Sequence, residues 1–411
     1  MIIAVLNLAI VVLLSRYTGA AGKGEASLIV TTIAMILLFC NMIGGSSLVY
    51  FVPRYNILQL FLLSNGWSLV VCAISYLIFI NTSIVPENTI IPIVLLSLIN
   101  SFLSTNLTIL LGKEKINTHN LISLLQTVLN IAILFFMIKG MNEANVNAYI
   151  LSLYAAMGSC LLVSSICVFP LIQNDTNQKQ QKLFTELAKF GLYNQAGHVM
   201  KFMSFRCTYY MLSGYSGDVM LGIFSNGVSL IESVFLISNS IATVLYPKVA
   251  NSTDLEYSQK LTLQLTKFSI LLCFIALVPL VLLPSGFFVW LFGSEFAGVH
   301  RVIVLLAPGI LFYNVALVIG HYFSGTGKYK VNTIANFIGL VTTLLLAAVY
   351  YPGFGITPVG IISTLSYVTT TAFVIFYFVK EANIKAWQLL PSYADFKWLR
   401  AEAASMFRKS S

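Results

Sequence analysis

The chain has 411 residues, of which 58% are hydrophobic and only 9% are charged. Soluble domains carry about 25% charged residues, so a soluble protein of this composition could not cover its surface with polar groups, and the surplus apolar surface must face lipid. The net charge of +9 does not indicate nucleic-acid binding, because membrane proteins retain cationic loops on their cytoplasmic side.

Twelve apolar segments follow one another along the chain. A helix needs about 20 apolar residues to cross the hydrocarbon core, and charge-poor stretches near that size recur at 2–14, 26–48, 58–80, 89–111, 119–138, 147–171, 191–212, 219–245, 264–284, 302–323, 332–351 and 357–379. These runs are continuous rather than alternating, which favours helices. The first is short, reaching about 20 Å at 1.5 Å per residue, so we expect the true start of the chain to lie upstream of Met1.

The loops between the segments carry their cations asymmetrically. With the N-terminus inside, the cytoplasmic segments hold 17 Lys and Arg residues and the outer loops hold 4, namely Arg16, Lys23, Lys139 and Arg301. A bias of this kind sets the orientation of a membrane protein. We therefore expect a multi-pass protein of the bacterial inner membrane with both termini in the cytoplasm.

The longest polar interior stretch divides the chain into two halves. We predict an N-terminal lobe at 1–172, a cytoplasmic linker at 173–190, a C-terminal lobe at 191–380 and a tail at 381–411 that lies in the cytoplasm or on the inner membrane surface.

An internal repeat supports this division. The string SRYTG at 15–19 aligns with SGYSG at 213–217, and the same register pairs Gly24 with Gly222 and Ser27 with Ser225. Both copies begin on an odd-numbered segment, so they share one orientation, as in repeats related by an axis along the membrane normal. The predicted fold class is an all-α polytopic membrane protein, with about twelve helices in two six-helix lobes related by a parallel pseudo-two-fold repeat.

Ionisable residues inside apolar segments indicate function, because charge in hydrocarbon is costly. In the seventh segment Asn194, His198 and Lys201 share one helical face, flanked by Arg206. We take these four as substrate-binding candidates, since Arg grips phosphate with two donors and Lys acts as a point charge. The alternatives are an ion pair with Glu232 for Lys201 and a hydrogen-bonded interior position for His198.

The eighth segment carries Glu232 in a polar stripe with Ser225, Ser229, Asn239 and Thr243. One hypothesis for this carboxylate is the binding of a coupling H⁺ or Na⁺, and the other is the ion pair with Lys201. We expect no enzymatic activity, because the chain contains neither His-Glu-x-x-His nor Gly-x-Ser-x-Gly. The six cysteines lack metal-ligand spacing, and no metal or other cofactor is expected.

Several short motifs resemble those of one family, the polysaccharide (O-antigen type) flippases of the multidrug/oligosaccharidyl-lipid/polysaccharide exporter superfamily. The string SRYTGAAGKGE at 15–25 looks like its Arg-x-x-Gly-x-x-Gly-x-Gly turn, and GGSSLVY at 44–50, followed by Pro53 and Arg54, looks like the end of its second helix. LGIFS at 221–225 and LYP at 245–247 look like its eighth-helix boundaries. The order and spacing of these motifs extend the resemblance over nearly the whole chain.

The resemblance implies a flippase that translocates a polyprenyl-diphosphate-linked oligosaccharide from the inner to the outer leaflet by alternating access. The cargo would be an O-antigen, capsule or exopolysaccharide repeat unit. The implied partners are this lipid-linked glycan, membrane lipids and glycan polymerase or assembly proteins, with no nucleic acid.

Two rival functions remain open. A cation-coupled multidrug antiporter of the same fold would need buried carboxylates, and we expect none in the first six segments, with Glu25 placed in a loop. A membrane-embedded glycan polymerase would need a large outer loop, and the largest expected here, around 284–301, is short.

Overall fold

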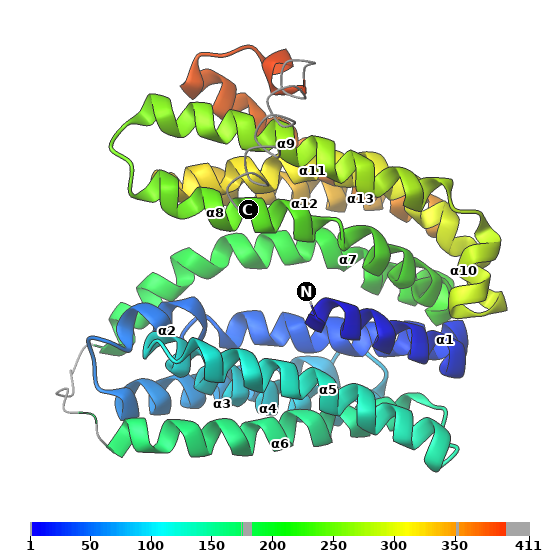
Figure 1. The fold of residues 1–411 in the computed structure, drawn as a ribbon. Helices are drawn as coiled ribbons and strands as arrows, with labels where there is room; N and C mark the ends of the chain where they lie inside the picture. Colours follow the sequence, from blue (N-terminus) through cyan, green and yellow to red (C-terminus); the bar gives the residue numbers. More distant parts are fainter. Residues whose placement is uncertain (1, 174, 176–182, 351–352, 392–411) are drawn as a thin grey trace, which may run out of the picture. The chain divides into compact units, whose positions relative to one another are not determined.

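The computed structural model describes residues 2–173, 175, 183–350 and 353–391, without the side chains of residues 46, 47, 190, 193 and 194. This part of the chain contains helices and no strand (Figure 1). Its contacts define two compact units. Unit 1 consists of Met1–Asn226 with Phe288–Ala297, and unit 2 consists of Gly227–Phe287 with Gly298–Ser411.

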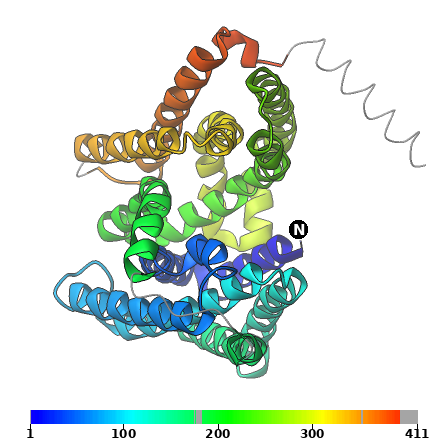
Figure 2. The same ribbon diagram turned by 90° about the vertical axis from the view of Figure 1, so that its left-hand side faces the viewer.

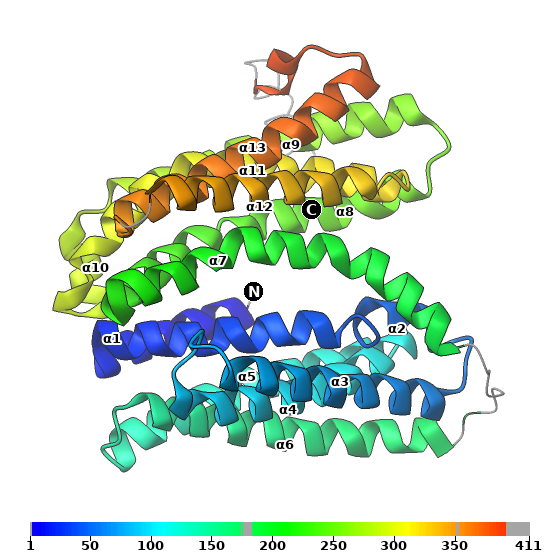
Figure 3. The same ribbon diagram turned by 180° about the vertical axis from the view of Figure 1, so that it is seen from behind.

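Unit 1 is a bundle built mainly from the first six helices. They are α1 (Ile2–Cys40), α2 (Gly45–Phe51), α3 (Ile57–Ile80), α4 (Glu87–Gly112), α5 (Ile116–Gly140) and α6 (Val146–Gln173). Helices α3 to α6 lie side by side (Figures 1 and 3), and the view along the helices shows them bundled with α1 (Figure 2). Polar pairs join them within an apolar core: Asn130 of α5 accepts a hydrogen bond from Ser152 of α6 at 2.9 Å.

Unit 1 also contains most of α7 (Leu183–Glu232), the end of α10 (Ser285–Phe292) and most of the short 3-10 helix η1 (Ser294–Gly298). Unit 2 holds the remainder of these elements together with α8 (Phe235–Ala250), α9 (Leu255–Leu282), α11 (Val299–Gly325), α12 (Lys330–Tyr350), α13 (Ile356–Ala382) and η2 (Ala386–Leu389).

Helix α11 is the central helix of unit 2 and packs against α8, α9 and α13. Its Asn314 is completely buried; the side-chain oxygen accepts a hydrogen bond from Ser238 of α8 at 2.5 Å, and the side-chain nitrogen donates to the Ile310 carbonyl at 2.8 Å. A buried amide needs such partners, so this asparagine joins helices within the apolar core.

The number of membrane crossings follows from two broken helices. Among the described residues, nine helices are long and apolar enough to cross a membrane, or ten when α7 and α8, bent by 40°, are taken as one span. Helix α1 is interrupted by a non-helical residue at Gly19, and α7 at Gly217. Each interruption divides one of these ten spans of the described chain into two, which gives the twelve crossings predicted from the sequence. The protein is therefore a multi-pass, all-α membrane protein.

Two predicted boundaries were wrong. The first segment does not end at residue 14, because α1 continues to Gly19 and the hydroxyls of Ser15 and Thr18 donate to carbonyls one turn earlier, at 2.7 Å each. The second segment is not one helix over 26–48, since α1 ends at Cys40 before α2 begins.

Part of the predicted linker is helical, because α7 begins at Leu183. Within 173–182 the structure describes only residues 173 and 175, and in the predicted tail it describes only 381–391. The boundaries of the two predicted lobes stay a prediction.

We predict that Asn314→Ala lowers the free energy of unfolding by about 0.5–2 kcal/mol, because it removes the buried hydrogen bond that Ser238 of α8 donates to α11. The measurement is thermal unfolding of the purified protein in detergent. Asn7→Ala is the control, since Asn7 is exposed on α1. An equal change in both variants would contradict the role of Asn314 as a helix joint.

Candidate functional site

The broken first and seventh helices turn at equivalent glycines. Gly19 has φ 70° and ψ −174°, and Gly217 has φ 79° and ψ 170°. Positive φ with extended ψ is essentially confined to glycine, so both turns depend on the absence of a Cβ. The sequence repeat pairs the same two residues, and the structure confirms this pairing at the backbone level.

Beyond these turns, α1 and α7 cross at backbone contact. A Cβ on Gly24 would lie 1.9 Å from the carbonyl oxygen of Asp218, and a Cβ on Gly222 would lie 1.9 Å from that of Ala20. The repeat pairs Ala20 with Asp218 and Gly24 with Gly222, so one two-fold relation exchanges the two contacts. Small residues let membrane helices approach this closely.

Two serines lie at the centre of the crossing. Ser27 and Ser225, which are equivalent in the repeat, are both buried, and their hydroxyl oxygens lie 2.9 Å apart. Ser225 belongs to the predicted polar stripe of Glu232, and it packs against Ser27 of α1. Ser229, Asn239 and Thr243 of that stripe are exposed.

Lys23 also lies at the crossing, and its placement in an outer loop was wrong. It is in the helical part of α1 that follows Gly19, and it is only 5% exposed. Its Nζ donates to Ser27 Oγ at 2.5 Å and to Ser225 Oγ at 3.1 Å. The sequence analysis left this charged segment outside the membrane helices because it assumed a loop there. The chain instead turns at the single residue Gly19 and continues as a helix that contains Lys23. The repeat held a signal for this position, because Lys23 precedes Gly24 where the other copy has Leu221.

The expectation that Glu25 lies in a loop was also wrong. Glu25 is half-buried within α1, close enough to the carboxylate of Asp218 on α7 to interact electrostatically. Asp218 accepts a hydrogen bond from Ser213 Oγ at 2.5 Å. The first six crossings therefore contain a carboxylate, which the charge argument against an antiporter had excluded.

The end of α10 and η1 hold the turn of α1 in place. Glu295 Oε2 accepts a hydrogen bond from the Ala20 backbone N–H at 2.6 Å, at the start of the second half of α1. Arg16, which the sequence analysis counted in an outer loop, donates from Nε to the Leu291 carbonyl at 2.9 Å and from a terminal nitrogen to the Trp290 carbonyl. The charged groups at this turn bind backbone.

Helix α7 follows α1 from the crossing to the gap before α2. Tyr210 and Thr32 share a hydrogen bond of 3.0 Å, and Gln195 Nε2 donates to the Asn41 carbonyl at 3.2 Å. A Cβ on Gly191 would lie 1.6 Å from the Met42 carbonyl oxygen. The helix that carries the predicted site is therefore fixed to α1 near both of its ends.

Helix geometry places Arg206 on a different side of α7 from His198 and Lys201. At about 100° per residue, Arg206 lies on the same side as Gln195 and Tyr210, which face α1, whereas His198 and Lys201 lie on adjacent sides. Lys201 and Arg206 are half-buried and His198 is exposed. Both roles considered for His198 stay predictions.

Aromatic rings accompany both cations. Lys201 Nζ lies 5.8 Å from the ring centroid of Phe205, and Arg206 Cζ lies 5.1 Å from that of Tyr209. The negative face of an aromatic ring attracts a cation at such distances. The side chain of Asn194 lies outside the described residues, and the binding role of all four residues stays a prediction.

Glu232 belongs to unit 2, whereas Lys201 belongs to unit 1. Glu232 is the last residue of α7, is half-buried and interacts electrostatically with Tyr313 of α11. Its roles as an ion site and as a partner of Lys201 both stay predictions.

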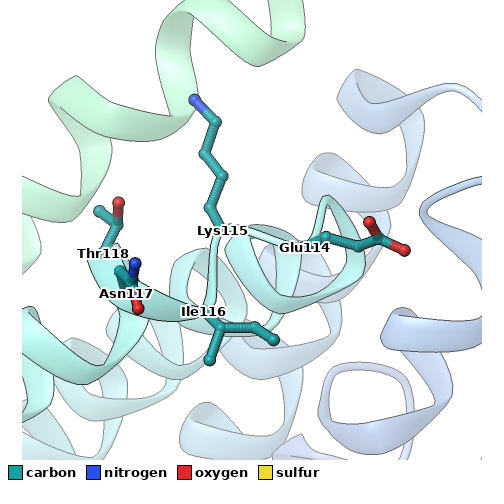
Figure 4. Close-up of a pocket in the computed structure, with 5 residues that line it drawn as sticks. All are labelled: Glu114, Lys115, Ile116, Asn117 and Thr118. Carbon is teal, nitrogen blue, oxygen red and sulfur yellow. The ribbon is translucent and has the colours of Figure 1, made fainter.

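A separate hollow of about 500 Å³ lies at the start of α5 and is lined by residues 114–118. Figure 4 shows Lys115 extending away from this turn, with Glu114 directed to another side. None of the predicted site residues lines it.

The fold is similar to that of solved transporters of the multidrug/oligosaccharidyl-lipid/polysaccharide (MOP) superfamily. The fold resembles that of a multidrug resistance MATE family transporter of this superfamily in its inward-facing conformation, with a TM-score of 0.71, 12% identity, and coverage of 93% of this chain and 94% of the other. It also resembles the lipid II flippase MurJ in its inward closed conformation, with a TM-score of 0.67, 16% identity, and coverage of 93% and 88%.

A sequence relative adds a second line of similarity. The capsular polysaccharide biosynthesis protein CapF of Staphylococcus aureus is 26% identical over 172 residues, which is 41% of this chain and 43% of that protein. The match thus spans less than half the length of this relative. No protein-family model matches the chain.

We predict that Gly24→Ala destabilises the protein by about 1–3 kcal/mol or more, because the new methyl group would overlap the Asp218 carbonyl and force the helices apart. Thermal unfolding in detergent provides the measurement. Gly66→Ala is the matched control: a Cβ there meets nothing within 4 Å, and replacing a mid-helix Gly by Ala stabilises by about 0.5–1 kcal/mol. Unchanged stability of Gly24→Ala would show that the crossing is not tightly packed.

Proposed function

We propose that this protein is a flippase that moves a polyprenyl-diphosphate-linked oligosaccharide from the inner to the outer leaflet and catalyses no chemical reaction. The observation that carries the proposal is the pair of half-buried cations, Lys201 and Arg206, on the membrane-crossing helix α7. A charge inside the membrane is costly and marks a substrate or ion pathway by default.

The chemistry of these cations suits a diphosphate. A guanidinium can bind two phosphate oxygens with parallel hydrogen bonds, and an ammonium acts as a mobile point charge. Because Arg206 and Lys201 lie on different faces of α7, they would contact a large anionic headgroup at separate points. The exposed imidazole of His198 lies one turn from Lys201 and adds a polar group for the sugar.

The similarities to known proteins support the same cargo class. One structural relative is named as a lipid II flippase, and the sequence relative is named as a capsular polysaccharide biosynthesis protein. For this chain they favour a glycan on a lipid carrier, within a bacterial inner membrane. Glycan polymerase or assembly proteins would be its partners.

The proposed orientation places both termini in the cytoplasm. Because Lys23 lies in a helix, the predicted outer loops keep three cations, Arg16, Lys139 and Arg301. This strengthens the excess of Lys and Arg on the predicted cytoplasmic side.

A cation-coupled multidrug antiporter is the second candidate. The two half-buried carboxylates Glu25 and Asp218 favour it, because cationic drugs and coupling ions need such groups. They lie next to the turns of α1 and α7, whereas the cations lie further along α7, so the two candidates depend on different residues.

We predict that Arg206→Glu reduces glycan translocation at least about tenfold, because a charge-assisted hydrogen bond contributes about 1.5–3 kcal/mol and the reversal adds repulsion. The measurement follows a labelled polyprenyl-diphosphate glycan across proteoliposome membranes. Arg206→Lys should retain part of the activity.

The control is Arg301→Glu, which changes an exposed arginine at the start of α11. This variant should translocate the glycan at the wild-type rate. Equal transport by Arg206→Glu and wild type, at equal protein in the membrane, would remove Arg206 from the site. The antiporter would be supported if the protein transported cationic dyes and not the glycan. Dye transport should then be lost in Glu25→Gln and kept in Arg206→Glu.

A further inference from the structure

Lys23 is a buried lysine that the proposed transport site does not use. It is 5% exposed, and its Nζ contacts the hydroxyl oxygens of Ser27 and Ser225. In the described part of the chain no carboxylate lies within salt-bridge distance of this nitrogen. Lysine is almost never fully buried unless it is paired.

The charged groups around Lys23 have other partners. On α1, Arg16 binds backbone carbonyls of α10, and Glu25 interacts with Asp218 of α7. Asp218 also accepts the hydrogen bond from Ser213, and Glu295 of η1 accepts that from the Ala20 N–H. Lys139, at the end of the neighbouring α5, lies 4.8 Å from the ring centroid of Tyr17. None of these groups neutralises an ammonium at Lys23.

The number of hydrogen-bond partners matches the neutral amine. A neutral amine has two N–H donors, and the structure supplies two acceptors, Ser27 Oγ and Ser225 Oγ. An ammonium has three N–H donors, so one would stay unsatisfied in the described surroundings. An unpaired buried charge and an unsatisfied donor both carry large costs.

The same contacts depend on the crossing itself. Ser225 comes from α7 and Ser27 from α1, and both are buried where the two helices meet at backbone contact. If the helices separated here, water could solvate an ammonium at Lys23. Close packing of α1 against α7 therefore disfavours protonation of Lys23, and protonation of Lys23 disfavours the close packing.

We propose that Lys23 is a proton-binding site that is empty when α1 and α7 cross closely and is filled when the crossing loosens. By linkage, the form that binds the proton gains population as the pH falls. Acidification then loosens this end of unit 1, by up to about tenfold in the opening constant per pH unit, the limit for one proton. The site does not depend on the identity of the transported solute.

The test measures hydrogen–deuterium exchange of the full-length protein in lipid nanodiscs, without substrate, from about pH 10 to about pH 6, the range over which lysines in proteins titrate. The readout is the protection factor, which corrects for the pH dependence of intrinsic exchange, in peptides covering 20–28 and 218–226. We expect protection in the wild type to fall by up to about tenfold per pH unit within the titration. Peptides around Asn130 and Ser152 serve as the internal reference and should not change.

Four variants, one of them a control, separate Lys23 from its neighbours. Lys23→Leu copies Leu221 of the other repeat and should keep high protection at every pH, whereas Lys23→Arg, which stays charged, should show low protection throughout. Glu25→Gln and the control Lys115→Leu, exposed at the start of α5, should retain the wild-type pH dependence.

A flat pH profile in the wild type, or the same profile in wild type and Lys23→Leu, would overturn the proposal. If Lys23→Arg fails to fold, the comparison with Lys23→Leu still decides. Loss of glycan transport in Arg206→Glu with an intact pH profile would separate this inference from the proposed function.

Discussion

Backbone contact between α1 and α7 is the constraint on which the rest of unit 1 depends. Neither helix can carry a side chain at Gly24 or Gly222, because each Cβ would overlap a carbonyl of the other helix. Lipid supplies no hydrophobic force between helices, so association depends on close packing and interhelical hydrogen bonds. The crossing provides both, through the glycines and through the hydrogen bonds of Ser27 and Ser225. It places α7, with Lys201 and Arg206, against α1.

The repeat is symmetric in its backbone and asymmetric in its charge. Gly19 and Gly217 adopt nearly the same conformation, yet the repeat aligns Lys23 with Leu221 and Arg16 with Gly214. Cations therefore occupy one copy of the turn only. Symmetric glycines suffice to build the fold, because they act through backbone shape. The buried lysine and the attachment of Arg16 to α10 are therefore found in the first copy.

The residues of α7 illustrate the limits of helical-wheel reasoning. The wheel placed His198 and Lys201 on one side and Arg206 beside it, which the helix geometry retains. It could not tell which side faces a neighbour, because that depends on Gln195 and Tyr210 meeting α1. Contacts with α1 assign Arg206 to the packed side and leave His198 exposed. Both assignments come from residues distant in sequence.

Membrane crossing, the twelve-helix count and the two-copy repeat were readable from residue order alone, because hydrocarbon thickness sets the length of each apolar run and glycine positions mark the repeat. The status of Lys23 and Glu25 was not readable. In the sequence, a charged residue near a glycine turn is typical of a loop. Lys23 is buried because α7 packs against this part of α1. Solvation of a side chain is a property of all its neighbours, and Ser225 lies about 200 residues away along the chain.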